Sequence, residues 1–284
     1  MAGKAGVVSQ ISIYPLKGAR AIDLTHGAAR ARGLAHDRRF IATDADGGFL
    51  TQRNCPALAT LDVTLTADGV RLSREGAGAV NAAAPGNGAR RTVTVWKHRV
   101  DALSVGGAAD RWLSAALGVE ARLFFMDAAA ERRTSDTWTE PAPVSFADGY
   151  PYLIATTASL KALNEAIEAS GGASVPMNRF RPNIVIDTDE PWAEDHWRTI
   201  TIGGAQFELV KPCDRCVVTT LDQKTGAAAS KEPLASLARL RRSADPRING
   251  VLFGWNATLR KQGDVSVGDA VSVTDRREEG WPIA

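Results

Sequence analysis

The chain has 284 residues, of which 44% are hydrophobic and 23% are charged, and its formal net charge is +2. This composition is typical of a folded globular protein, and so small a net charge does not support binding to nucleic acid or to a membrane surface. Three cysteines do not make a secreted disulfide framework, residues 1–8 lack the apolar segment of a signal peptide, and no stretch approaches the roughly 18 apolar residues of a membrane span. We therefore expect a cytoplasmic protein with no membrane span and no nucleic-acid partner.

Short segments with alternating polarity dominate the first half of the chain. They predict strands at residues 6–14, 39–43, 49–53, 61–65, 70–73, 92–96 and 119–126. Two of the intervening turns, 44–48 and 67–69, predict hairpins. Residues 76–91, rich in Gly and Ala, are expected to form a flexible connection. One helix is predicted over residues 108–117, with Gly118 as its C-cap.

The second half begins with residues 127–149, whose mixture of charge, Pro and Gly predicts a loop or a cleft wall. The elements expected after it are a strand at 152–155, a helix at 157–169, a strand at 183–187, a hairpin at 198–210, a helix at 232–242 and a strand at 265–271. There are many strands, few helices and no βαβ rhythm. We therefore predict a mainly β (α+β) fold with two β-rich lobes that meet near residues 127–149.

Two of the three cysteines, Cys213 and Cys216, form a C-x-x-C motif. A redox dithiol needs a helix after its first cysteine, but the β-branched residues 217–221 predict a strand. A structural zinc site needs four ligands, and the remaining Cys and His residues are scattered. In an extended segment residues three apart point to opposite faces, so one cysteine is expected to project alone into a pocket, where Lys211 and Arg215 favour the thiolate. That thiolate could be a metal ligand or a sulfur carrier, and the alternative is a pair of inert buried cysteines.

Basic residues recur where predicted strands meet turns, namely Lys17, Arg38, Arg53, Arg179, Arg181 and Arg215. Side chains at such positions can converge on an anion, and arginine binds phosphate in a bidentate manner. Asp148 precedes an apolar strand, where a carboxylate could handle a proton, contact a metal-bound water or simply stabilise a turn. A glycine-rich dinucleotide fingerprint and a Walker loop are both absent from the sequence.

Taken together, several segments resemble the MOSC family with its N-terminal β-barrel domain, in particular bacterial relatives of the mitochondrial amidoxime-reducing component. The matching segments are residues 14–18, 36–40, 49–53, 146–153, 178–183, 211–216, 219–220, 253–254 and 267–269. They follow the family's order and cover nearly the whole chain. The resemblance implies a MOSC-type β-barrel over residues 127–284, packed with the N-terminal β-barrel domain over residues 1–126.

The resemblance also implies a molybdenum cofactor, a pterin that carries a dithiolene and a phosphate. Cys216 matches the cysteine that ligates molybdenum, which agrees with the preference of such a metal for soft thiolate. Lys17 and Arg38 match positions that hold the phosphate. Gly18 matches a neighbouring position, where it can contact the cofactor only through its backbone. The remaining matches are Arg181 and Asn183 at the pterin, Asp214 and Arg215 beside the ligand, and the catalytic carboxylate Asp148 near the open side of the metal.

The implied activity is a two-electron reduction of small N-hydroxylated substrates, in which the N–O bond is cleaved and water is lost. Because no cysteine follows Cys216, an iron–sulfur cluster is not expected there, and the electrons would come from a separate reductase. Two alternatives remain open. One is a sulfur-carrier module that acts through a Cys216 persulfide, and the other is a non-catalytic carrier of the cofactor.

Overall fold

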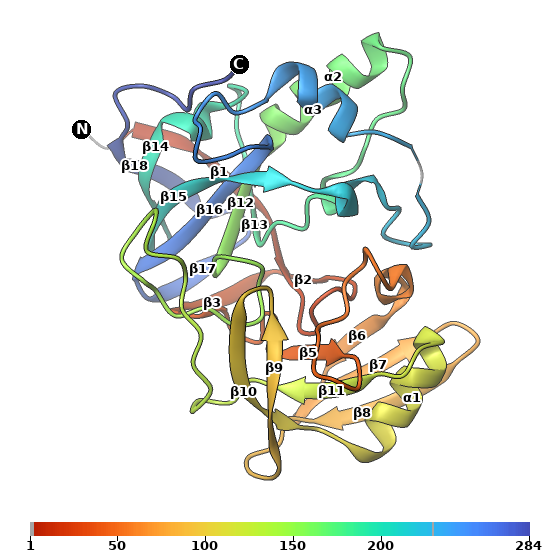
Figure 1. The fold of residues 1–284 in the computed structure, drawn as a ribbon. Coiled ribbons are helices and arrows are strands. Elements are labelled where there is room, and N and C mark those ends of the chain that lie inside the picture. Colours follow the sequence, from red (N-terminus) through yellow and green to blue (C-terminus); the bar gives the residue numbers. More distant parts are fainter. Residues whose placement is uncertain (1–2, 229) are drawn as a thin grey trace.

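The computed structural model describes residues 3–228 and 230–284, and within these ranges it contains two lobes (Figure 1). In the barrel lobe, seven strands form a closed ring, because its first and last strands, β13 and β1, also pair with each other. In order around the ring, the strands are β13 (Ile184–Asp187), β12 (Tyr152–Thr156), β16 (Val251–Lys261), β15 (Ala205–Arg215), β14 (Trp197–Ile202), β18 (Ala270–Arg276) and β1 (Gly3–Ile13). This arrangement confirms the predicted mainly β fold. Strand β2 (Ile22–Leu24) extends the sheet beyond β1.

The N-terminal lobe occupies the lower part of Figure 1 and contains two smaller antiparallel sheets. The first consists of β5 (Phe40–Thr43), β11 (Arg122–Phe125), β10 (His98–Ser104) and β9 (Arg90–Val95). The second consists of β6 (Asp62–Leu65), β7 (Gly69–Arg74) and β8 (Gly78–Ala83), and helix α1 (Gly107–Leu117) and the 3-10 helix η1 (Pro56–Thr60) accompany these sheets. A third small sheet of β17 (Gly263–Ser266), β3 (His26–Arg30) and β4 (Gly33–Leu34) joins early and late parts of the chain.

The barrel closes around an apolar core to which strands from both ends of the chain contribute. Ile11 and Ile13 of β1 pack there with Tyr152, Phe207 and other inward-facing residues, all of them buried. Alternate residues of a strand point to the same face, which explains why the alternating pattern of residues 6–14 predicts β1 correctly. Since β1 pairs with β13 and β18, the start of the chain lies within the C-terminal sheet. The division at residues 126 and 127 stays a prediction.

The expectation that the fold has no βαβ rhythm is wrong. Strands β12 and β13 pair in parallel, and the crossover between them is helix α2 (Thr157–Ala169). Thr156 caps this helix by accepting the Ser159 N–H, and its bounds agree with the predicted ones. The two strands and the helix were each predicted, but their order along the chain alone does not show that the two strands pair in parallel.

Three further segments differ from the sequence prediction. Within the expected flexible connection, residues 78–83 form β8, which pairs with β7 along its whole length. Residues 217–220 form the 3-10 helix η4 (Val217–Thr220) instead of a strand, because the Thr219 and Thr220 hydroxyls donate to carbonyls three residues earlier. The predicted second strand at 49–53 is reduced to one bridge between Thr43 and Phe49, followed by a turn.

Strand β16 runs through residues for which no strand was predicted, and it bends at Gly254. This glycine has a φ of 72°, and a Cβ there would lie 2.8 Å from the carbonyl oxygen of Ile154 on β12. Only glycine permits both this backbone conformation and the close approach of the two strands. The remaining elements are α3 (Leu234–Leu240), η2 (Met177–Arg179) and η3 (Ala193–His196). None of the helices in the described ranges is long and apolar enough to cross a membrane.

Candidate functional site

A cavity of about 390 Å³ opens between the barrel lobe and the N-terminal lobe. Its walls come from the turn after β1, the segments around Arg38 and Arg53, the end of the 127–149 loop and the end of β15. The structure brings all nine predicted site residues to this one cavity: Lys17, Gly18, Arg38, Asp148, Arg181, Asn183, Asp214, Arg215 and Cys216. Of the six basic residues expected to converge, only Arg179 does not line it. The Arg179 side chain is buried elsewhere, 3.6 Å from Asp222.

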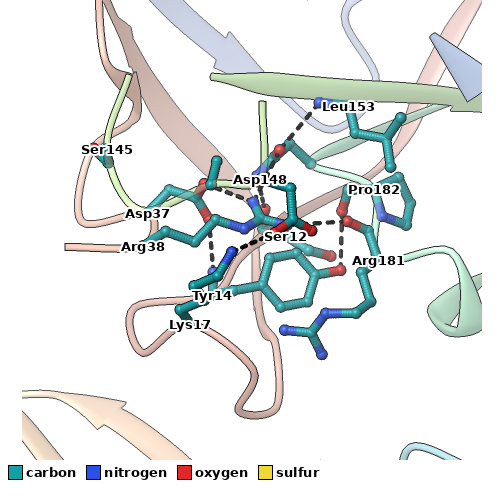
Figure 2. Close-up of polar contacts among 12 residues, drawn as sticks. Ser12, Tyr14, Lys17, Asp37, Arg38, Ser145, Asp148, Leu153, Arg181 and Pro182 are labelled. Carbon is teal, nitrogen blue, oxygen red and sulfur yellow. Dashed lines mark hydrogen bonds and ion pairs between the residues drawn. The ribbon is translucent and has the colours of Figure 1, made fainter. Parts of the chain in front are cut away.

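Lys17 and Asp148 form an ion pair across the cavity floor, with Lys17 Nζ 2.6 Å from Asp148 Oδ1 (Figure 2). Only 9% of the lysine side chain is exposed, whereas 71% of the aspartate side chain, which also lines the cavity, is exposed. Desolvation lowers the pKa of Lys17, and Asp148 opposes this shift. Desolvation by the surrounding protein raises the pKa of Asp148, but Lys17, Arg38 and Trp96 outweigh it and hold that pKa well below its usual range. The proton therefore resides on Lys17, and Asp148 is ionised.

Trp96 is a site residue that the sequence analysis did not identify. Its indole N–H donates to Asp148 at 3.2 Å, and the Arg53 guanidinium stacks 4.6 Å from its ring centroid. Trp96 occupies the turn between β9 and β10 with a φ of 55°, a left-handed conformation that is uncommon for a bulky residue. No sequence signal indicated this role, because residue 96 falls at the end of a predicted strand and its partner Asp148 lies 52 residues away.

Tyr14 is buried between two arginines, Arg38 and Arg181, that line the cavity. The Arg38 and Arg181 guanidinium carbons are 4.4 Å and 4.2 Å from its ring centroid, and its hydroxyl donates to the Pro182 carbonyl at 3.1 Å (Figure 2). Burial raises the pKa of Tyr14 to about 12 although both arginines oppose the shift. Burial also lowers the pKa of Arg181 to about 10. The stacked ring holds the two cations side by side despite their mutual repulsion.

Arg38 and Asn183 are joined to each other and to the protein interior. Arg38 Nη1 lies 2.7 Å from Asp37 Oδ2 and 3.2 Å from Asn183 Oδ1. The Asn183 amide also accepts the Leu153 N–H at 3.2 Å and donates to the Ser12 carbonyl at 3.1 Å. All polar atoms of this amide thus have protein partners, so a cofactor contact from Asn183 would have to compete with these bonds.

Both cysteines of the C-x-x-C motif line the cavity, so the expectation that only one would do so is wrong. The pairing of β15 with β16 is irregular between Pro212 and Asp214, and β15 ends at Arg215, so the strict alternation of a strand is lost between the two cysteines. Cys213 Sγ lies 2.8 Å from Arg215 Nη1. Burial raises the pKa of Cys213 and Arg215 opposes the shift.

Cys216 is exposed, with its Sγ 3.6 Å from Arg53 Nη2. A nearby guanidinium stabilises a thiolate, so Cys216 is the more available of the two sulfur atoms. The third cysteine, Cys55, is buried in the core of the N-terminal lobe. In the described ranges, no group of three or more His, Cys, Asp and Glu side chains is placed to hold a metal ion. A metal at Cys216 would therefore need most of its ligands from a bound cofactor.

The cavity has the charge of an anion-binding site. Six basic residues line it, namely Lys17, Arg38, Arg53, Arg181, Lys211 and Arg215, against the two carboxylates of Asp148 and Asp214. Asp214 pairs with Lys211 at 2.6 Å. The buried Arg215 Nε has no hydrogen-bond partner in the described part of the chain. Gly18 contributes backbone only, and its carbonyl accepts a bond from Gln52 at 2.7 Å.

Comparison of the sequence with known protein families agrees with this geometry. The MOSC domain model matches residues 141–272, and the MOSC N-terminal beta barrel domain model matches residues 5–120. Mitochondrial amidoxime-reducing component 1 of Homo sapiens is 31% identical over 287 residues, covering 94% of this chain and 83% of the relative. The chain belongs to the MOSC family.

Other relatives show how far the similarity of this MOSC protein extends. Mitochondrial amidoxime reducing component 2 of Rattus norvegicus is 29% identical and covers 94% of this chain and 83% of the relative. Molybdenum cofactor sulfurase of Danio rerio is 28% identical over 257 residues, which cover 84% of this chain but only 31% of the sulfurase. The MOSC protein is thus similar to nearly the full length of the first group and to less than a third of the second.

Proposed function

We propose that this MOSC protein is a molybdenum-cofactor-dependent reductase of N-hydroxylated compounds. The observation that carries the proposal is the exposed Cys216 sulfur at the edge of a cavity whose basic lining residues outnumber its carboxylates. A single thiolate suits a metal that arrives with its own dithiolene ligands, and excess positive charge suits a cofactor that carries a phosphate. The residues present therefore fit the group that family membership implies.

The residues that line the cavity would have different roles at the proposed cofactor. Cys216 would hold molybdenum, with Arg53 stabilising its thiolate. Arg38 and Arg181 would bind the anionic end of the cofactor, and Lys17 would share its ammonium between that end and Asp148. When bound, the molybdenum cofactor supplies the two electrons that cleave the N–O bond. Those electrons come from a separate reductase, since the chain is proposed to carry no second redox centre.

The protein's own part in the reaction is to move protons. Converting an N–OH group to N–H and water consumes two protons together with the two electrons. Because the proton of the pair resides on Lys17 Nζ, this ammonium would donate one proton and then be reprotonated from solvent to supply the second, while the ionised Asp148 orients it through their 2.6 Å contact. Burial lowers the pKa of Lys17 and makes proton release easier than from an exposed lysine.

A sulfur-carrier role is the second candidate, favoured by the similarity to part of the molybdenum cofactor sulfurase and by the exposed Cys216. Metal and pterin analysis of freshly purified protein separates the two. Stoichiometric molybdenum with pterin supports the reductase, whereas a cyanide-labile sulfur on Cys216 without metal supports the carrier. Turnover of benzamidoxime with reduced benzyl viologen as electron donor then distinguishes a reductase from a protein that only carries the cofactor.

Asp148→Asn is expected to lower the turnover of benzamidoxime by about 10²–10⁴-fold while the pterin content stays unchanged. The amide cannot hold the Lys17 ammonium by charge, and the buried lysine loses its only carboxylate contact within hydrogen-bonding distance among the described residues. Asp62→Asn is the matched control, because Asp62 forms an ion pair of the same length, 2.6 Å, with Arg20 outside the cavity. Equal turnover in both variants would remove Asp148 from the proton transfer.

A further inference from the structure

A second cavity of about 260 Å³ adjoins the first. The two share the wall formed by residues 148–150 and Lys211, so a molecule that reaches Asp148 from one side can extend into the other. The rest of the second wall comes from the 127–149 loop and from His98 at the start of β10. The loop is held in place by Arg132, which donates to the carbonyls of Ser145 at 2.8 Å and Asp148 at 2.6 Å.

The second cavity is basic, and its positive charge is poorly compensated. Arg132, Arg133 and Lys211 line it, and of these Lys211 is paired with Asp214 at 2.6 Å. Asp148, the one carboxylate among the lining residues in the described ranges, is already paired with Lys17, so Arg133 carries the least compensated charge. Arg132 is 5% exposed and its hydrogen bonds in the described part of the chain go to backbone carbonyls, with Asp148 as the nearby carboxylate that acts on its charge. An additional anion would therefore be attracted to this wall.

Two buried donors in the same wall have no hydrogen-bond partner among the residues that the structure describes. They are Arg132 Nε and the hydroxyl of Tyr150, a residue that is 8% exposed and lines both cavities. Buried donors are seldom left unpaired, because the lost hydrogen bond to water is not replaced. Both atoms are almost inaccessible in this structure, so they add to the polarity of the wall without facing the cavity directly.

Trp138 provides an aromatic surface in the second cavity. The Arg247 guanidinium lies 4.3 Å from its ring centroid, and the Trp281 ring lies 5.6 Å from it. These contacts fix the orientation of the indole, although the 127–149 loop that carries it has no helix or strand. A fixed ring beside a basic wall suits a ligand that is both planar and anionic.

We propose that the second cavity is a substrate subsite that binds a carboxylate, so the preferred substrates are aromatic N-hydroxylated compounds that carry this group. The inference rests on the proposed function for the chemistry at Cys216 and adds the substrate class. The N–OH group lies in the first cavity near Asp148, the ring passes the shared wall toward Trp138, and the carboxylate faces Arg133 and Lys211.

The test measures binding and does not depend on turnover. Purified protein is titrated with 4-carboxybenzamidoxime, with benzamidoxime and with the cationic 4-aminomethylbenzamidoxime, and the His98 ring signals are followed by NMR after assignment with His98→Gln. We expect the carboxylated probe to bind roughly threefold or more tightly than the neutral one, and the cationic probe to bind least tightly. Burial, Arg132 and Lys97 lower the pKa of His98, so a bound carboxylate should raise it.

Arg133→Gln should abolish most of the preference for the carboxylated probe, because it removes a basic residue that lines only the second cavity. Arg99→Gln is the matched control, since Arg99 is exposed, adjacent to His98 and outside both walls. Equal affinities for the neutral and carboxylated probes, with His98 unmoved, would overturn the subsite. A binding preference without reduction of any probe by the cofactor-loaded protein would overturn the proposed function and leave the subsite standing.

Discussion

Cys216→Ala is expected to yield a folded protein that retains essentially no molybdenum, whereas Cys213→Ala retains most of it. The two sulfur atoms line the same cavity but differ in availability. Cys213 Sγ is 2.8 Å from Arg215 Nη1 and has a raised pKa, while Cys216 is exposed beside Arg53. A metal ligand must be reachable, and the exposed Cys216 meets this condition better than Cys213.

The measurement is elemental analysis together with pterin fluorescence on wild-type protein and both variants, purified identically. Because each substitution removes one cysteine sulfur atom from the same cavity, each variant serves as the control for the other. Alkylation with iodoacetamide adds a second readout, since bound cofactor should protect the Cys216 thiol of the wild type from the reagent. Loss of the metal in Cys213→Ala but not in Cys216→Ala would reverse the ligand assignment.

Arg38→Ala is expected to cost about 3–5 kcal/mol in the free energy of unfolding and also to lower the pterin content. Asp37 is 1% exposed and its carboxylate lies 2.7 Å from Arg38, so removal of the guanidinium leaves a buried charge without its cation. The same guanidinium faces the cavity, where we propose that it binds the anionic end of the cofactor. Urea unfolding of cofactor-free protein measures the first effect, and pterin fluorescence after gel filtration measures the second.

The double variant Asp37→Asn/Arg38→Ala separates these two roles. Its amide carries no charge to be left buried, and its oxygen can still accept the Tyr14 N–H, a bond of 2.8 Å in the native protein. We therefore expect most of the stability to return while the pterin content stays low. If stability and pterin content return together, the guanidinium acts on the cofactor only by supporting the fold.

Features that depend on nearby residues could be predicted from the sequence. Helix α2 agrees with its predicted bounds because its apolar spacing and its Thr156 cap are both local. Helix α1 likewise ends at Gly118, whose φ of 71° is the left-handed conformation expected of a glycine C-cap. The hairpin of β14 and β15 was also predicted, because its turn at Gly203 and Gly204 is a local feature.

Features that depend on distant partners could not be predicted in this way. The closure of the barrel requires β1 to pair with β13 and β18, which lie far along the chain. Strand β8 was missed because a Gly- and Ala-rich segment shows no strand alternation. Strands β12 and β13 were each predicted, but their parallel pairing was not, because pairing depends on a partner distant in sequence. Trp96 and Arg132 were overlooked since their partners at Asp148 are remote in sequence.

The sequence by itself determined which chemical groups are available and, through its ordered motifs, the MOSC family. Only the tertiary structure decided that nine of those residues surround one cavity, that both cysteines face it, and that Lys17 and Asp148 meet across 131 residues of chain. The charge state of this pair depends on burial and on distances between atoms. Those quantities are set by the packing of the two lobes, which no local pattern of residues encodes.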